Sequence, residues 1–170
     1  MWVFDATPLI YLAKVDHLTL VSHLEEPCVI PEHVYTEVVE TGIEHGYPDA
    51  RRIERCVEDD MLTVISVDDD EFVSRIQRNP KLSDADVAVL ACADTHDGVA
   101  VMDETYGRDV ASTEGITTRG TAYLVLSLAS QNAISVEKAR TVIDEMVEKG
   151  WYCSPSMYAK IVQKLESFSG

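Results

Sequence analysis

Two short apolar runs in this sequence each end in an aspartate. Asp5 follows "WVF", and Asp103 follows "VAVM". Short runs rich in β-branched residues are typical of strands buried in a parallel sheet. The carboxyl ends of such strands form the edge of the sheet at which ligands bind. A carboxylate at two of these ends therefore predicts an acidic site at one edge of the sheet.

Other acids fall where they could reach the same edge. Glu37 lies on a predicted helix after the second apolar run, and Asp84 and Asp86 lie in the first turn of the helix that precedes Asp103. We expect three or four of these carboxylates to converge. Carboxylates that lie close together repel one another unless a divalent cation lies between them. Oxygen ligands without histidine or cysteine select Mg²⁺ or Mn²⁺, and such an ion can activate water against a phosphodiester.

Each acid has a simpler explanation when it is taken alone. An aspartate at a strand end is commonly a turn residue, and Asp103 could begin an acidic helix. Asp84 and Asp86 could be ordinary first-turn acids, and Glu37 in "TEVVE" could belong to a solvated helix face. Their order and spacing along the chain are what favour a shared site.

The elements that must position these acids alternate along the chain. Strands are predicted at "WVF", "CVIP" (28–31), "LTVISV" (62–67) and "VAVM" (99–102). Helices are predicted between them, because proline is favoured in the first turn of a helix and serine or threonine just before it. The expected helix starts are Thr7 with Pro8, Pro31, Pro48 and Ser83.

The last fifty residues change in character and predict three amphipathic helices, with serine caps at Ser135 and Ser154. We therefore expect an α/β fold, with helices that cross over between parallel strands. The chain of 170 residues fits a single domain. In this interpretation, residues 1–117 form the α/β core and residues 118–170 a helical C-terminal extension.

The net charge of −16 comes from 30 acids against 14 bases. By charge alone, such a chain repels nucleic acid. Either its partners are cationic, or its source is halophilic and salt screens the repulsion; the scattered acids favour the second explanation. Basic residues cluster in "RRIER" (51–55) and "RIQRNPK" (75–81). These predicted helices could form a local patch for RNA, or they could simply be solvated faces.

Other site classes are not expected. No apolar run reaches the ~18 residues that a membrane span needs, and the N-terminus lacks the pattern of a signal peptide, so a cytoplasmic location is expected. The four cysteines are far apart without a CxxC pair, and the five histidines show no HExxH spacing. Disulfide frameworks and zinc sites are therefore not predicted.

The order of the motifs resembles the PIN-domain family of metal-dependent ribonucleases. That family has a first strand ending in Asp, a P-x-x-V-x-x-E helix, an L-S-x-x-D-A-like helix and a strand ending in an Asp pair. The corresponding segments are "VFDATPLI", "PEHVYTE", "LSDADVAVLACA" and "VMDETYGRDVASTEGI". The C-terminal part is similar to the helical tail of a longer prokaryotic branch related to VapC-type toxins. The resemblance implies a PIN-like α/β/α sandwich.

The resemblance also implies roles for individual residues. Asp5, Glu37, Asp86 and Asp103 match the catalytic acids of the family, and Asp5, Asp86 and Asp103 would hold Mg²⁺ or Mn²⁺. Asp84 matches less well by register. The family's second strand-end aspartate is replaced here by Glu104, so Glu104 or Asp109 is an alternative fourth acid. Thr7 is expected to orient Asp5 or to contact substrate. Arg108 could hold a phosphate of the substrate, or it could instead pair with Glu104, which lies four residues earlier.

Two classes of function follow from the resemblance. The first is an endoribonuclease that hydrolyses RNA phosphodiesters, and it could be the toxin of a toxin–antitoxin pair that is blocked by a small antitoxin protein. The second is a catalytically inactive PIN-like module for binding or assembly. A homodimer is expected in either case. A receiver domain phosphorylated on aspartate is less favoured, because it would need a lysine on a late strand, and the late lysines, from Lys138 onward, lie on predicted helices.

Overall fold

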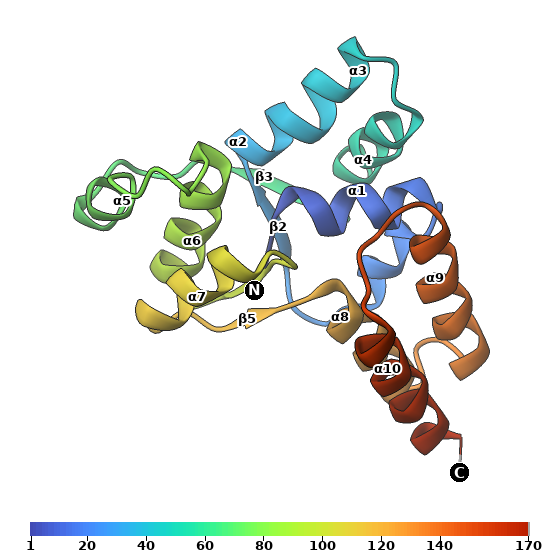
Figure 1. The fold of residues 1–170 in the computed structure, drawn as a ribbon. Helices are drawn as coiled ribbons and strands as arrows, with labels where there is room; N and C mark the ends of the chain where they lie inside the picture. The colour runs from blue at the N-terminus through green and yellow to red at the C-terminus, as the bar shows by residue number, and fades with distance from the viewer. Residues whose placement is uncertain (170) are drawn as a thin grey trace.

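A computed structural model describes residues 1–169 and contains a parallel sheet of five strands (Figure 1). All neighbouring strands are parallel and the order is β3-β2-β1-β4-β5. The strands are β1 (Trp2–Phe4), β2 (Cys28–Pro31), β3 (Thr63–Ile65), β4 (Val99–Val101) and β5 (Thr118–Arg119). The α/β class, the parallel sheet and the four predicted strand positions are thus confirmed.

Helices connect the strands and follow the last of them. Before β4 they are α1 (Ala6–Lys14), η1 (Leu18–His23), α2 (Glu32–Tyr35), η2 (Thr36–Thr41), α3 (Gly42–Glu44), α4 (Pro48–Glu58), α5 (Glu71–Ile76) and α6 (Asp84–His96). After β4 they are α7 (Thr105–Thr113), α8 (Thr121–Ser130), α9 (Val136–Glu148) and α10 (Pro155–Phe168). Helices α2, η2 and α3 follow one another directly and form one rod, in which η2 is a wider π-helical turn.

The sheet lies between two layers of helices. Helix α6 packs on β1, β2 and β4, and Figure 1 shows α1, α4 and α9 on the opposite side of the sheet. Helix α6 is buried almost all round, from Val87 to Ala93, as expected of a helix with few polar positions. Phe4, Leu9 and Ile30 are fully buried in the same core. This is the layered α/β/α arrangement that the PIN-domain resemblance implied.

Three local predictions are corrected. The first helix begins at Ala6 with Asp5, rather than Thr7, at its N-cap position. Residues 75–81 are not a helix, because α5 ends at Ile76 and a turn leads to Ser83. The predicted extension also begins with a strand, because β5 pairs with β4 (Val101 opposite Arg119). A strand of two residues carries too little pattern to be recognised from sequence.

The C-terminal helices pack on one another and on the core. Ser135 and Ser154 cap α9 and α10 as predicted, each accepting a hydrogen bond from a backbone N–H three residues on. Helices α8, α9 and α10 contact each other, and α9 contacts α1. One apolar cluster includes buried residues from both parts of the chain, such as Leu9 and Ile143. A single domain over residues 1–170 stays a prediction.

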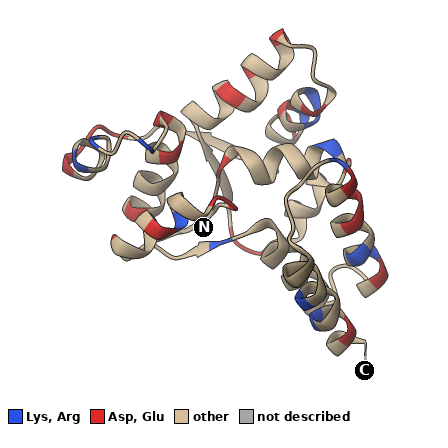
Figure 2. Ribbon diagram, viewed as in Figure 1, with Lys and Arg blue, Asp and Glu red and all other residues tan. Residues whose placement is uncertain are grey.

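Acidic residues are spread over most helices and are not confined to one segment (Figure 2).

Among residues 1–169, no helix is long and apolar enough to cross a membrane.

Candidate acidic site

Asp5 is buried at the carboxyl end of β1, with only 7% of its surface exposed. Its backbone N–H donates to the carbonyl oxygen of Val101 on the neighbouring strand β4 (3.0 Å), which fixes the main chain at this point. Asp5 occupies the N-cap position of α1, but its side chain makes no capping hydrogen bond. The carboxyl is thus held in place by its backbone.

The pKa of Asp5 is raised from 3.8 to about 7. Burial is the main cause, because it disfavours the charged form, and the negative charges of Asp86, Glu37 and Asp103 add to it. The nearby backbone N–H of Ala6 acts in the opposite direction. The structure therefore places the other three predicted catalytic acids close enough for their charges to act on Asp5, although the four come from β1, η2, α6 and the end of β4.

Glu37 and Asp86 reach the site from helices. Glu37 lies in the π-helical turn η2, a rare distortion that is frequent at functional sites. The pKa of Glu37 is also raised, by partial desolvation and by the charge of Asp86. Asp86 lies in the first turn of α6 and forms a capping box with Ser83: each backbone N–H donates to the other side chain, at 3.0 Å. The predicted serine cap therefore also orients Asp86.

Asp103, unlike Asp5, has several hydrogen-bond partners. The backbone N–H of Thr121 donates to Oδ1 (2.8 Å), and the Thr121 hydroxyl donates to Oδ2 (2.7 Å). The indole N–H of Trp151 donates to Oδ2 as well (3.1 Å). Both donor residues are buried and both belong to the C-terminal part of the chain. The partners of Asp103 were not predicted from the sequence.

The remaining candidates are distributed around these acids. Thr7 is half-buried in the first turn of α1. Glu104 caps α7, accepting from the backbone N–H groups of Tyr106 and Gly107 at 2.7 Å each. Within residues 1–169, the alternative ion pair between Arg108 and Glu104 does not form.

Arg108 lies near Asp103, although the two form no direct ion pair among the described residues. A Cβ atom placed at Gly120 would be 3.3 Å from Nη1 of Arg108 and 3.0 Å from Oδ1 of Asp103. The side chain of Arg108 is exposed, as is that of Asp109 on the same helix. Arg108 therefore stands at the acidic edge with its guanidinium accessible.

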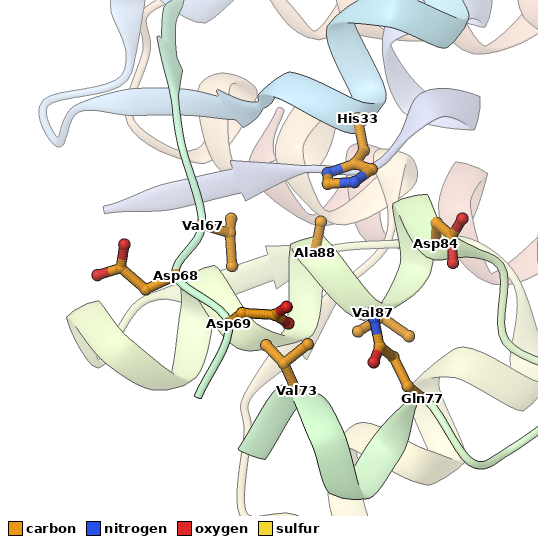
Figure 3. A pocket seen from close by; sticks show the side chains of 9 residues that line it. All are labelled: His33, Val67, Asp68, Asp69, Val73, Gln77, Asp84, Val87 and Ala88. Carbon is orange, nitrogen blue, oxygen red and sulfur yellow. The ribbon is translucent and has the colours of Figure 1, made fainter. Parts of the chain in front are cut away.

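Asp84 belongs to a different cavity from Asp86. It lines a hollow of about 230 Å³ with His33, Asp68 and Asp69 (Figure 3). Val73, Val87 and Ala88 form the apolar part of this hollow. The charges that raise the pKa of Asp5 are those of Asp86, Glu37 and Asp103, and not that of Asp84. Since Asp84 and Asp86 are two residues apart on α6, they point to different sides of the helix.

The donor chemistry of the acidic site suits a hard divalent cation. In residues 1–169, no Lys, Arg or His nitrogen lies within 4.0 Å of the four carboxylates, so no protein cation neutralises them. Burial raises the pKa of Asp5, and the charges of Asp86, Glu37 and Asp103 raise it further. Within this same range, however, no three His, Cys, Asp or Glu side chains are gathered tightly enough to form a ready-made ligand shell. The residues fit Mg²⁺ or Mn²⁺ in ligand type and charge.

A family model described as a PIN domain matches residues 1–167. The chain belongs to the PIN-domain family. No curated protein and no solved structure matches it. PIN domains are generally nucleases that use divalent metals, so membership indicates a hydrolase acting on nucleic acid. The PIN-domain resemblance inferred from the sequence is confirmed. The VapC-like subtype and the roles of the individual acids stay predictions.

Proposed function

We propose that this PIN domain is a metal-dependent endoribonuclease that hydrolyses RNA phosphodiesters. One observation carries the proposal: a buried carboxyl, Asp5, has a pKa of about 7 because of burial and three neighbouring acids. Maintaining such repulsion costs stability, and strongly perturbed acids cluster at functional sites. Among the described residues it has no cationic partner, which argues against a purely structural role.

In this proposal, Asp5, Asp86 and Asp103 hold Mg²⁺ or Mn²⁺. The bound ion would stabilise negative charge that develops on the phosphoryl group. Their supports differ in kind: Asp5 is fixed by its buried strand end, Asp86 by its capping box and Asp103 by Thr121 and Trp151. Rigid support of this sort keeps ligands in position before substrate binds.

Glu37 is the best candidate for the proton acceptor. Its side chain is accessible to solvent, and partial desolvation together with the charge of the neighbouring Asp86 raises its pKa. A carboxylate with a raised pKa is a stronger base at working pH and can take the proton of an attacking water. Thr7 and Arg108 would contact the substrate, and the exposed guanidinium of Arg108 suits a phosphate oxygen. Glu104, as a fourth acid, would have to act beside its capping role.

A pair of aspartates on α6 gives a matched test. Asp86→Asn should abolish Mn²⁺-dependent cleavage of a structured single-stranded RNA. Asp84→Asn, two residues away and facing another cavity, should retain wild-type activity. Thermal melts would show that both variants fold. RNA binding by wild type without cleavage in Mn²⁺ or Mg²⁺ would instead support an inactive binding or assembly module.

The biological setting that we propose is a VapC-like toxin, neutralised by a small antitoxin protein, and acting as a homodimer in the cytoplasm. A short neighbouring gene that encodes a small DNA-binding protein would support the pairing. Co-expression of that protein should then suppress RNA cleavage. Light scattering of the purified chain would test the dimer directly. A halophilic source would be supported by activity that increases with molar salt.

A further inference from the structure

We infer that Trp151 and Thr121 are positioning residues that make the C-terminal helices part of the acidic site. They donate three hydrogen bonds to the carboxylate of Asp103, two of them to Oδ2. The inference deepens the proposed function and rests on it, because it concerns how Asp103 is presented to a cation. It also assigns a role to segments that follow the four acidic motifs.

The turn after α9 brings Trp151 to Asp103. Gly150 adopts a φ of +100°, a conformation that other residues rarely reach. The N–H of Gly150 bonds to the carbonyl of Val147 (3.0 Å), and that of Trp151 bonds to the carbonyl of Met146 (2.9 Å). These are the two bonds of a Schellman motif, which ends a helix and reverses the chain. The indole is thereby buried, with 3% of its surface exposed.

Strand β5 brings Thr121 to the same carboxylate. The N–H of Met102 bonds to the carbonyl of Arg119 (2.9 Å), so the residue after β5 lies beside the end of β4. Thr121 is the first residue of α8, so its N–H has no acceptor within the helix and donates instead to Asp103. Its hydroxyl adds the second bond, and the side chain is fully buried. Two independent turns of the chain therefore converge on one carboxylate.

The three donors leave a single bonding position on Asp103. An ionised carboxylate offers about four lone-pair positions, two on each oxygen. Oδ2 accepts from Thr121 and Trp151, whereas Oδ1 accepts, among residues 1–169, only the Thr121 backbone N–H. A side chain at residue 120 would come within 3.0 Å of Oδ1, and glycine leaves this oxygen uncovered. Asp103 can therefore offer a cation only Oδ1, as a single ligand atom.

Mn²⁺ titration calorimetry on four variants tests the inference. Trp151→Phe keeps an aromatic ring and loses the donor, and Thr121→Val keeps the shape and loses the hydroxyl. Both should bind Mn²⁺ about tenfold more weakly, because outer partners of metal ligands commonly contribute tenfold or more. Both should also lower kcat for RNA cleavage without changing KM. Thr121→Ser should restore wild-type values.

Tyr158→Phe is the matched control, because it removes a hydrogen bond between a C-terminal side chain and a carboxylate remote from the proposed ligands (Tyr158 to Asp144, 2.6 Å). It should leave Mn²⁺ affinity unchanged. Wild-type affinity in both Trp151→Phe and Thr121→Val would overturn the positioning role while leaving the nuclease proposal standing. Absence of Mn²⁺ binding by wild type would overturn both. If Trp151→Phe melts below the assay temperature in EDTA, the Thr121→Val and Thr121→Ser pair decides.

The two tryptophans give a readout independent of activity. In NMR spectra of the indole N–H groups, addition of Mg²⁺ should shift the signal of Trp151 and leave that of Trp2 in place. Trp2 packs near Tyr123 (ring centroids 6.5 Å apart), and in the described part of the chain its indole donates to none of the four acids. An unmoved Trp151 signal under saturating Mg²⁺ would contradict the inference.

Discussion

Asp5 and Asp103 come from the same sequence signal, an apolar strand that ends in an acid, but the fold treats them in opposite ways. Asp5 is buried without a side-chain cap bond and among other acids, and its pKa rises to about 7. Asp103 is more exposed and accepts three hydrogen bonds. At Asp5, negative charges lie close together, and a cation would relieve their repulsion. At Asp103, hydrogen bonds fix the orientation of the carboxylate. Both properties would be needed in the proposed metal site, one to favour ion binding and one to orient a ligand.

Asp5→Asn should have the largest effect, and it tests the comparison most directly. A pKa difference of one corresponds to about 1.36 kcal/mol, so the change from 3.8 to about 7 disfavours the folded protein by about 4 kcal/mol at pH 8. Removing the charge should raise the free energy of unfolding in EDTA by up to that amount and abolish Mn²⁺-dependent cleavage. Urea unfolding and an RNA cleavage assay measure the two effects. Full cleavage by the variant, or lower stability in EDTA, would assign Asp5 to the ordinary strand-end residues.

The wild-type protein should show the same effect as a pH dependence of stability in EDTA. Between pH 3.8 and about 7, the unfolded chain has lost the Asp5 proton while the folded protein keeps it. The Asp5 contribution is therefore complete below pH 4 and is lost as pH rises through 7. The difference between the unfolding free energies of Asp5→Asn and wild type should increase over this interval. A constant difference from pH 4 to 8 would contradict the raised pKa.

Asp103→Asn should change the free energy of unfolding in the opposite direction from Asp5→Asn. The amide that replaces one oxygen cannot accept from the donors of Thr121 and Trp151, and hydrogen bonds to a charged group contribute about 1.5–3 kcal/mol each. We expect the free energy of unfolding in EDTA to fall by about 2 kcal/mol, after the relief of repulsion on Asp5 is subtracted. Chemical denaturation beside Asp5→Asn makes the comparison direct. Equal gains in both variants would show that repulsion dominates at both strand ends.

The parts of the candidate site that depend on local sequence pattern could be predicted. Asp5 and Asp103 were found because strand ends are marked by apolar runs, and Asp86 because Ser83 marks a helix start. The error at the first helix has a physical reason: an acid at the strand end also serves as N-cap position, so the helix begins before Thr7. Patterns of a few residues determine these features.

The supports of Asp103 could not be found in this way. Trp151 is separated from Asp103 by 48 residues, and its place depends on how α9 packs. Only the "EKGW" segment gave a local signal, since glycine after a helix indicates a reversal. Strand β5 was missed because it has two residues. Contacts that depend on the packing of whole helices produce no characteristic residue spacing in the sequence, so they could not be predicted from it.

Gly120→Ala sharpens the comparison at a smaller scale, because it affects access to Oδ1 of Asp103 and leaves its donors in place. The added Cβ would approach Oδ1 at 3.0 Å, closer than ordinary contact, so neighbouring atoms must shift by a few tenths of an ångström. The backbone at residue 120 has a φ of −87°, which alanine adopts freely. We expect a stability change of about 1 kcal/mol or less, and a loss of Mn²⁺ affinity of about tenfold. Calorimetry that shows wild-type affinity would mean that Oδ1 is not the ligand atom.

The smallest effect is expected where the acidic edge meets the substrate, at Arg108. Its guanidinium is exposed beside Asp103, whereas Arg52 is bound to the carbonyl of Ala13 (2.7 Å) and Arg75 to Glu114 (2.6 Å). Arg108→Ala should therefore weaken RNA binding several-fold, whereas Arg52→Ala, from the "RRIER" cluster, should leave it nearly unchanged. For single strands, each phosphate contact contributes about 0.7 to the slope of log affinity against log salt, so the slope should fall by about that amount in Arg108→Ala alone. Fluorescence anisotropy from 50 to 500 mM salt, in Ca²⁺ to suppress cleavage, measures both quantities. An unchanged slope in Arg108→Ala with a reduced one in Arg52→Ala would move the RNA path from α7 to α4.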